Sequence, residues 1–180
     1  MFATDNLDAQ SASDLEFDAT AASILGAELP SAAERHLREA GAAYHRDDIA
    51  ETHLLAAVGA APDHPAALIG LYRFYFYKGR LTEALGVARK CLAKALSELG
   101  LAADWRKVAR RDADFGSFSA VLPRFFMFTL KGYAYLQMRI GAVNEGRAAV
   151  EKLLDLDPSD KVNARLLLIV ADRLGVEDDD

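Results

Sequence analysis

Apolar residues recur every three to four positions along most of the chain after residue 28, with polar residues between them. This spacing predicts amphipathic helices that each bury one face. No stretch alternates apolar and polar residues over several positions with β-branched side chains, which is the pattern of a half-buried strand. The sequence therefore predicts an all-α fold.

Short clusters of helix-breaking residues divide this pattern into segments of about three to five helical turns. The first helix is predicted to start at Ser31. Its hydroxyl can accept a hydrogen bond from a free N–H group of the first turn, and Glu34 can reach back in a capping box. The later breaks fall at 62–65, 78–80, Gly100, 114–119, Pro123, Gly141 and 158–160.

The breaks repeat at a regular interval, which indicates internal repeats. If Pro62 and Pro158 occupy the same position of a 34-residue unit, one unit covers 31–64 and a second covers 65–98 without a gap. A third unit then covers 127–160. The chain is thus predicted to carry about three similar helical hairpins.

The remaining segments are assigned from their composition and position. Residues 99–126 form an insertion between the second and third units, and 160–174 are predicted to form a cap helix that covers the apolar flank of the last unit. The acidic residues 1–28 are predicted to be mostly disordered, and 176–180 form an acidic tail. The folded repeat domain is therefore predicted at 29–175.

The second unit resembles the tetratricopeptide repeat (TPR), a helix–turn–helix family with small residues where the two helices touch and a proline at the end of the repeat. The matching residues are Leu68, Leu71, Tyr75, Gly79, Ala84, Ala88 and Cys91. The first unit lacks the turn glycine, and the third has Gly146 where alanine is usual. The resemblance implies a right-handed stack of about three repeats closed by a C-terminal capping helix.

A second resemblance concerns two longer segments. Residues 68–81 (LIGLYRFYFYKGRL) and 123–141 (PRFFMFTLKGYAYLQMRIG) are similar to segments of small bacterial TPR proteins encoded beside nitrogen-fixation genes. This likeness implies a genomic context and assigns no role to any residue.

The formal net charge of −6 is unevenly distributed. Residues 1–30 contain six acidic and no basic residues, whereas residues 31–176 contain 21 basic and 17 acidic residues. Cys91 is the only cysteine, so an intrachain disulfide is excluded and a reducing compartment is favoured. The N-terminus lacks a signal-peptide pattern, and no apolar run is long enough to span a bilayer, so we expect a cytoplasmic protein without a membrane partner.

Motifs of catalysis, cofactor binding and metal binding are missing from the sequence. His36, His45 and His53 do not show the i, i+4 spacing of a helical metal pair. Cys91 occupies a position that the repeat pattern requires to be small and packed, which favours an inert core thiol. Glycine-rich phosphate loops and the GxSxG and HExxH motifs do not occur. We therefore expect neither an enzyme nor a bound cofactor or metal.

The TPR resemblance implies a concave groove lined by the first helix of each repeat. The residues that it places there are Arg35, Arg73, Phe76, Tyr77, Phe128, Lys131, Tyr135 and Arg139. Such a groove suits a protein or peptide partner with acidic and apolar side chains, because aromatic rings provide buried area and cations select charge. In the alternative interpretation, Phe76, Tyr77 and Phe128 only pack between repeats.

The insertion provides a second candidate surface. It carries the only tryptophan beside four cations, in the set Trp105, Arg106, Lys107, Arg110 and Arg111. Helical spacing would place Arg106 with Arg110, and Lys107 with Arg111, on shared faces. This patch could bind nucleic acid or a protein. We favour the alternative of a solvated helix with Trp105 filling the junction between the second and third repeats, so we do not expect a nucleic-acid partner.

The acidic N-terminal segment is complementary to the predicted groove. Residues 14–18 (DLEFD) combine three acidic residues with two apolar ones. Because this segment belongs to the same chain as the groove, its effective concentration would be high. Residues 10–25 could therefore occupy the groove in the same or a neighbouring molecule. In the alternative interpretation they form a free, solubilising tail.

Overall fold

The computed structural model describes residues 28–117 and 119–177 and shows an all-helical protein in that part of the chain. Within it, no residue adopts strand structure, which confirms the predicted all-α class. The helices are α2 (Ser31–Ala42), α3 (Asp47–Ala60), α4 (Pro65–Tyr77), α5 (Leu81–Glu98), α6 (Val121–Arg139), α7 (Val143–Leu156) and α8 (Arg165–Glu177), with the short 3₁₀ helices η1 (Trp105–Lys107) and η2 (Arg110–Asp112) between α5 and α6.

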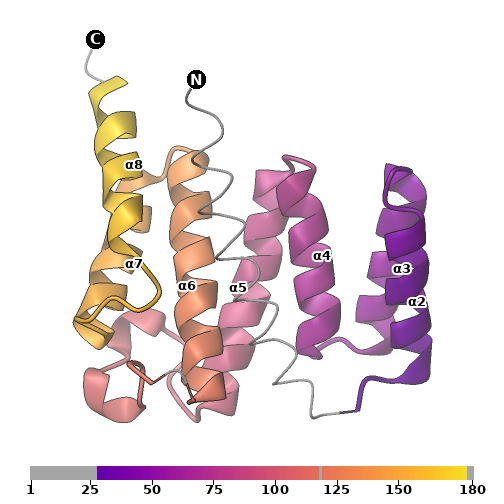
Figure 1. The fold of residues 1–180 in the computed structure, drawn as a ribbon, viewed down its shortest axis with the longest axis horizontal. Coiled ribbons are helices and arrows are strands. Elements are labelled where there is room, and N and C mark those ends of the chain that lie inside the picture. Colours follow the sequence, from indigo (N-terminus) through magenta and orange to yellow (C-terminus); the bar gives the residue numbers. More distant parts are fainter. Residues whose placement is uncertain (1–27, 118, 178–180) are drawn as a thin grey trace.

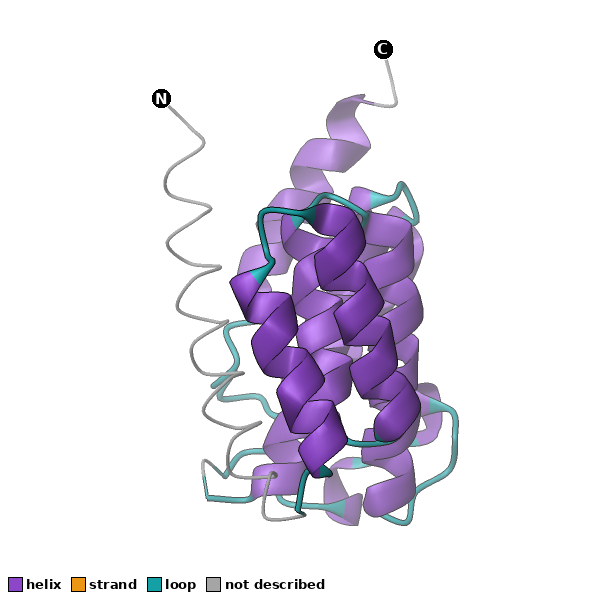
Figure 2. Ribbon diagram, turned by 90° about the vertical axis from the view of Figure 1, so that its right-hand side faces the viewer, coloured by secondary structure: helices purple, strands orange, loops and turns teal. Residues whose placement is uncertain are grey.

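The helices form successive hairpins arranged in two layers. Figure 1 shows the pairs α2–α3, α4–α5 and α6–α7 side by side, with α8 beside the last pair. Figure 2, which views the α2–α3 end, shows α2 and α3 in separate layers. Helices α2, α4, α6 and α8 belong to one layer, and α3, α5 and α7 belong to the other.

Helix α6 begins at Val121, inside the segment 99–126 that the sequence assigned to an insertion. Pro123 is compatible with this start, because the first N–H groups of a helix need no intrahelical partner.

Two of the hairpin turns depend on glycine. Gly79 and Gly141 have φ angles of 72° and 92°, in the left-handed region that other L-residues rarely adopt. After each glycine the next N–H group donates back into the preceding helix, from Arg80 to the Tyr75 carbonyl oxygen (2.8 Å) and from Ala142 to the Gln137 carbonyl oxygen (2.8 Å). These bonds end α4 and α6 in the manner of a Schellman motif. They produce the reversal that the sequence predicted at both positions.

The main hydrophobic core runs through the stacked hairpins and is densest on α6. Phe125, Phe126 and Leu130 of that helix are buried almost completely. The first hairpin differs, because most of the buried residues of α2 and α3 are alanines, with Leu54 the only large one. Alanine buries little apolar area, so the α2–α3 hairpin gains less from packing than the hairpins after it.

The segment between α5 and α6 packs against the third hairpin. Asp104 caps η1 by accepting from the Arg106 N–H (3.0 Å), and Asp112 accepts from the Ala109 N–H (2.8 Å). Between the two short helices Val108 is extended and buried. The continuous helix that would have placed Arg106 with Arg110 is therefore wrong. The local carboxylates hold two separate turns instead.

The last helix begins later than predicted. The sequence placed the cap helix at 160–174, whereas α8 begins at Arg165. Asp160 lies in the preceding turn, where its carboxylate accepts from the N–H groups of Ala164 (2.6 Å) and Arg165 (3.1 Å). Leu166 and Ile169 are 42% and 50% exposed, because the consecutive apolar residues 166–170 cannot all face inward on one helix. Among the described residues, no helix combines the length and the apolar character needed to cross a membrane.

Candidate interaction surface

Helices α4 and α6 combine aromatic and basic residues and contain no aspartate or glutamate. Their sequences are PAALIGLYRFYFY and VLPRFFMFTLKGYAYLQMR. The cations are Arg73 on α4 and Arg124, Lys131 and Arg139 on α6. The two helices lie in the same layer of the stack (Figure 1).

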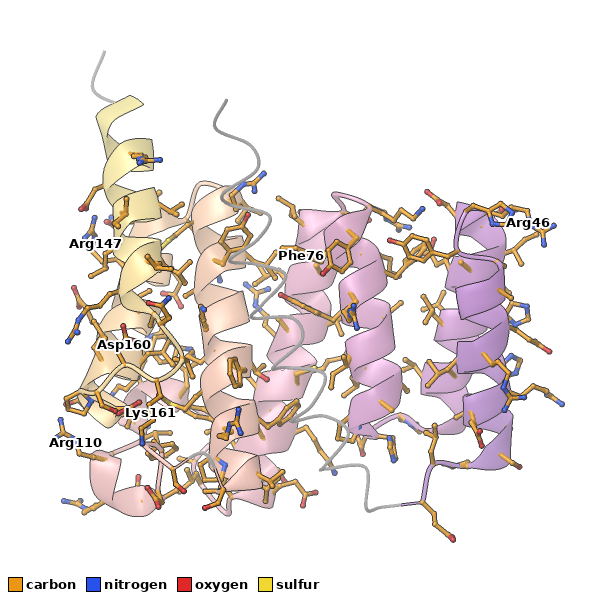
Figure 3. The ribbon with its side chains drawn as sticks, in the orientation of Figure 1. Arg46, Phe76, Arg110, Arg147, Asp160 and Lys161 are labelled. Carbon is orange, nitrogen blue, oxygen red and sulfur yellow. The ribbon has the colours of Figure 1, made fainter. Side chains whose placement is uncertain are left out.

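Phe76 is the centre of an aromatic cluster that joins the two helices. Its ring stacks on Tyr72 with centroids 5.9 Å apart, meets Tyr77 edge-on at 5.5 Å, and lies 5.7 Å from Tyr135 of α6. Figure 3 shows Phe76 near the upper end of α4. Gly132 allows this approach, because a Cβ atom there would lie 2.9 Å from the Tyr72 hydroxyl oxygen. The contact of α4 with α6 is thus made by aromatic rings over a glycine.

Basic side chains border this cluster. The Arg73 guanidinium lies 5.8 Å from the Tyr77 ring centre, within the range of a cation–π contact. Arg139 lies 5.6 Å from the Tyr135 ring centre and donates to the Tyr135 hydroxyl (2.6 Å). Lys131 is half-buried one helical turn before Tyr135. We call the set Tyr72, Arg73, Phe76, Tyr77, Lys131, Tyr135 and Arg139 the aromatic–basic face.

Two residues predicted for the groove lie elsewhere. Phe128 is 5% exposed and belongs to the hydrophobic core, with the Arg124 guanidinium 5.7 Å from its ring centre. Its prediction as a groove residue is therefore corrected, because the bulk of its ring packs inside the stack. Arg35 is exposed on α2, a helix that packs mainly on α3 and only thinly on α4. The structure thus brings together six of the eight predicted residues, all on α4 and α6.

The second predicted patch is largely structural. Trp105 is 7% exposed and packs edge-on against Tyr133 of α6 at 6.1 Å. The Arg106 guanidinium contacts both oxygens of Glu145 (2.5 and 2.6 Å), and Arg110 donates to the Asp155 carbonyl oxygen (2.8 Å). Figure 3 shows Arg110 where the inter-helix segment meets the α7–α8 connection.

The other two cations of that patch, Lys107 and Arg111, are exposed.

Glu145 also accepts from the Tyr133 hydroxyl (2.6 Å). The Tyr133 hydrogen bond and then the Arg106 contact hold the pKa of Glu145 below its usual value, although burial acts in the opposite direction. Arg106 therefore belongs to a local network that ties the segment to α6 and α7.

The structure gathers three further polar side chains that the sequence left apart. His36 and Glu39 of α2 meet His53 of α3, with the His36 and His53 Nδ1 atoms 3.1 Å apart. The i, i+4 spacing of a helical metal pair does not reveal this group, because the two histidines lie 17 residues apart on two helices. Two signals in the sequence could have revealed the group. The predicted hairpin pairs the helices that carry His36 and His53, and the i, i+3 spacing places His36 and Glu39 on one face of their helix.

A pocket of about 630 Å³ lies where the described chain begins. Glu28 and Pro30 line it together with the α3–α4 connection, the end of α5, and Val121, Leu122 and Phe125 at the start of α6. The N-terminal segment therefore joins the fold beside the first turns of α4 and α6. Residues 10–25, the predicted occupant of the groove, lie outside the described residues.

Comparison with known proteins finds a relative from a nitrogen-fixing bacterium. The chain is 36% identical over 127 residues to an uncharacterized 19.8 kDa protein in the nifW 5′ region of Azotobacter chroococcum mcd 1, and the match covers 70% of this chain and 71% of that protein. No family model and no solved structure matches the chain. The relative agrees with the predicted likeness to proteins encoded near nitrogen-fixation genes.

Proposed function

This chain belongs to the same family as the 19.8 kDa Azotobacter protein, and we propose that it is a protein-binding adaptor that holds an acidic, apolar segment of its partner on the aromatic–basic face. The observation that carries the proposal is the composition of α4 and α6. Together they contain four cations and no acidic residue, and four of their rings, those of Tyr72, Phe76, Tyr77 and Tyr135, form one cluster.

We infer a TPR-like architecture, and its hairpins support this proposal. Three hairpins follow one another in two layers, two of them turn at a glycine with positive φ, and helix α8 packs on the last hairpin. A single hairpin cannot bury its apolar face, so stacked repeats require such neighbours. In a stack of this kind α2, α4, α6 and α8 are the first helices, and they would form the binding surface.

The chemistry of the face indicates the chemistry of its partner. Tyr77 is 46% exposed, and Phe76 and Tyr135 are half-buried, so apolar side chains can cover further ring surface. Arg73 and Arg139 each combine a charge with an aromatic ring, an arrangement that suits a carboxylate beside an apolar group. We therefore expect a partner segment in which Asp or Glu residues alternate with Leu or Phe.

The N-terminal segment of the chain has this composition. Residues 1–27 contain five acidic and no basic residues, and residues 14–18 read DLEFD. The segment joins the fold at Glu28, beside the first turns of α4 and α6. Twenty-seven residues can span far more than the roughly 29 Å length of α6. We propose that residues 10–25 compete with the partner for the aromatic–basic face.

The genomic position of the relative supports a proposal about the biological context of the partner. Because the Azotobacter protein is encoded in the nifW 5′ region, we propose that the partner is a cytoplasmic protein made together with the nitrogen-fixation genes. An assembly or regulatory adaptor fits a small, TPR-like chain whose proposed site binds rather than catalyses.

Nucleic-acid binding through Trp105, Arg106, Lys107, Arg110 and Arg111 is the second candidate that the sequence raised. Two observations disfavour it: Trp105 is buried, so it cannot stack on a base, and Arg106 already pairs with Glu145. If nucleic acid were the partner, binding would weaken steeply with salt. We expect the shallower dependence of a partly apolar protein interface.

The proposal is tested by capturing partners from an extract of the native host grown without fixed nitrogen. The wild-type chain is compared with the double variant Arg73→Glu/Lys131→Glu, and captured proteins are identified by mass spectrometry. The matched control is Lys107→Glu/Arg111→Glu, which changes the net charge equally on another surface. We expect a nitrogen-fixation protein to be lost with the first variant and retained with the control. Equal retention by all three chains would contradict the proposed site.

A further inference from the structure

Three metal-binding side chains converge between the two helices of the first hairpin. The Nδ1 atoms of His36 on α2 and His53 on α3 lie 3.1 Å apart. One carboxylate oxygen of Glu39 lies 3.1 Å from His53 Nδ1 and 3.8 Å from His36 Nδ1. His36 and Glu39 share one face of α2 because they are three residues apart, and the pairing of α2 with α3 brings His53 opposite to them.

The separations match those of ligands on a single small ion. A point equidistant from the three atoms lies about 2.0 Å from each of them, which is the bond length of Zn²⁺ to imidazole nitrogen and carboxylate oxygen. Tetrahedral ligands at this bond length lie about 3.3 Å apart, within the range of the three measured separations. For tetrahedral coordination the 3.8 Å separation between Glu39 and His36 must shorten by about 0.5 Å, a small shift for partly exposed side chains.

Protons satisfy this arrangement poorly. When both imidazoles are neutral and lack a proton on Nδ1, each of the three neighbouring atoms carries a lone pair and none of them carries a donor hydrogen. A proton on His53 Nδ1 can form one good hydrogen bond, either to the Glu39 carboxylate or to His36 Nδ1. The other of these two acceptor atoms is then left without a donor inside the group. A divalent cation accepts all three lone pairs at once.

We propose that His36, Glu39 and His53 bind a divalent transition-metal ion of the zinc class. Two imidazoles and one carboxylate favour Zn²⁺, Co²⁺ or Ni²⁺ over Mg²⁺ and Ca²⁺, which prefer oxygen ligands alone. The three side chains are 23%, 46% and 26% exposed, so water or a ligand from outside the chain can reach the fourth coordination position. The assignment is independent of the aromatic–basic face, which lies on α4 and α6.

The ion would cross-link the two helices that have the weakest core. The buried residues shared by α2 and α3 are chiefly alanines, whereas the later hairpins bury phenylalanine, leucine and methionine. Bonds from the ion to α2 at His36 and Glu39, and to α3 at His53, would hold the helices together where apolar burial is small. Metal binding and the folding of this hairpin are therefore linked.

The site is tested with the full-length, untagged chain after treatment with a chelator, because a polyhistidine tag would bind the same ions. Zn²⁺ is titrated by calorimetry, and Co²⁺ binding is followed by its visible d–d absorption. The test variants are His36→Ala, His53→Ala and Glu39→Gln. His45→Ala is the matched control, since His45 is exposed in the turn of the same hairpin.

We expect one ion per chain for wild type and His45→Ala, with affinities within about twofold of each other. Losing a ligand should weaken binding by more than about 100-fold, beyond the roughly 10–100-fold effect of losing an outer-shell partner. Circular dichroism tests whether each variant is folded. If either alanine variant is unfolded, Glu39→Gln still tests the site, because it preserves the size of the side chain. A wild-type chain without saturable binding, or ligand variants that bind as tightly as wild type, would overturn the assignment.

Discussion

Gly146 of α7 lies so close to Ala134 of α6 that a Cβ atom on Gly146 would be only 2.7 Å from the Ala134 carbonyl oxygen. The same Cβ atom would lie 2.5 Å from the Met138 side chain. A backbone atom cannot move away as the end of a side chain can, so the two helices of the third hairpin require glycine at this position. The sequence had shown Gly146 only as a departure from the alanine that is usual in the repeat.

Gly146→Ala should therefore destabilise the protein by about 1–3 kcal/mol through overpacking. Gly86→Ala is the matched control, because a Cβ atom at Gly86 meets no heavy atom within 4 Å. There alanine should stabilise α5 by about 0.5–1 kcal/mol through its higher helix propensity. Urea denaturation of the two variants measures both changes. Equal effects of the two substitutions would show that α6 and α7 do not approach as closely as described.

Two glutamates should make folding stability depend on acidic pH. Arg80 and then Tyr75 hold the pKa of Glu51 below its usual value of 4.5, through hydrogen bonds of 2.6 and 2.8 Å. Glu145 is shifted in the same direction. A carboxyl group with a lower pKa in the folded state stabilises it above the pKa of the unfolded state, and this contribution is lost as the pH falls through the folded-state pKa.

Glu51→Gln should consequently lower stability at pH 7 and flatten its fall between about pH 5 and pH 3. The comparison is made by urea denaturation of wild type and variant at each pH. Glu34→Gln is the control, since Glu34 forms an exposed ion pair with Arg38 on the surface of α2. The assignment fails if Glu51→Gln and wild type lose stability in parallel as the pH is lowered.

Cys91 should be unreactive in the folded protein. It is 1% exposed, and burial raises the pKa of its thiol to about 12. Because the thiolate is the reactive form, a thiol reagent at pH 8 should modify native protein far more slowly than protein unfolded in urea. Cys91→Leu should destabilise by about 1–3 kcal/mol through overpacking. Rapid modification of native protein would contradict the buried position.

The helical hairpins could be predicted from local signals in the sequence. Gly79 and Gly141 could be recognised as turns, because positive φ has a specific residue preference. Features that depend on competing hydrogen bonds or on tertiary contacts could not be predicted in this way. The broken helix around Val108 depends on carboxylates that compete with helical hydrogen bonds, and the exposure of Ile169 depends on how α8 rotates against α7.

The candidate sites likewise combine residues that local sequence patterns predict with residues whose positions depend on the packing of the helices. Phe76 and Tyr135 were predicted from their repeat positions and do meet across α4 and α6, and Arg73 lies beside Tyr77 on α4. Phe128 fell in the same pattern, but its ring is buried, since repeat position alone does not fix the packing of neighbouring helices. The approach of His36 to His53 required the pairing of two helices, which spacing along one helix does not reveal.

The most direct test of the aromatic–basic face uses a fluorescent peptide of residues 10–25 and a chain that begins at residue 29, so that no tail competes. Fluorescence anisotropy measures the peptide affinity of wild type, Arg73→Glu/Lys131→Glu and Lys107→Glu/Arg111→Glu at physiological salt. Circular dichroism verifies equal helix content. We predict saturable binding that falls at least about tenfold, or about 1.4 kcal/mol, in the first variant and stays within about twofold of wild type in the second. Undetectable binding to the wild-type chain, or equal losses in both variants, would contradict the account.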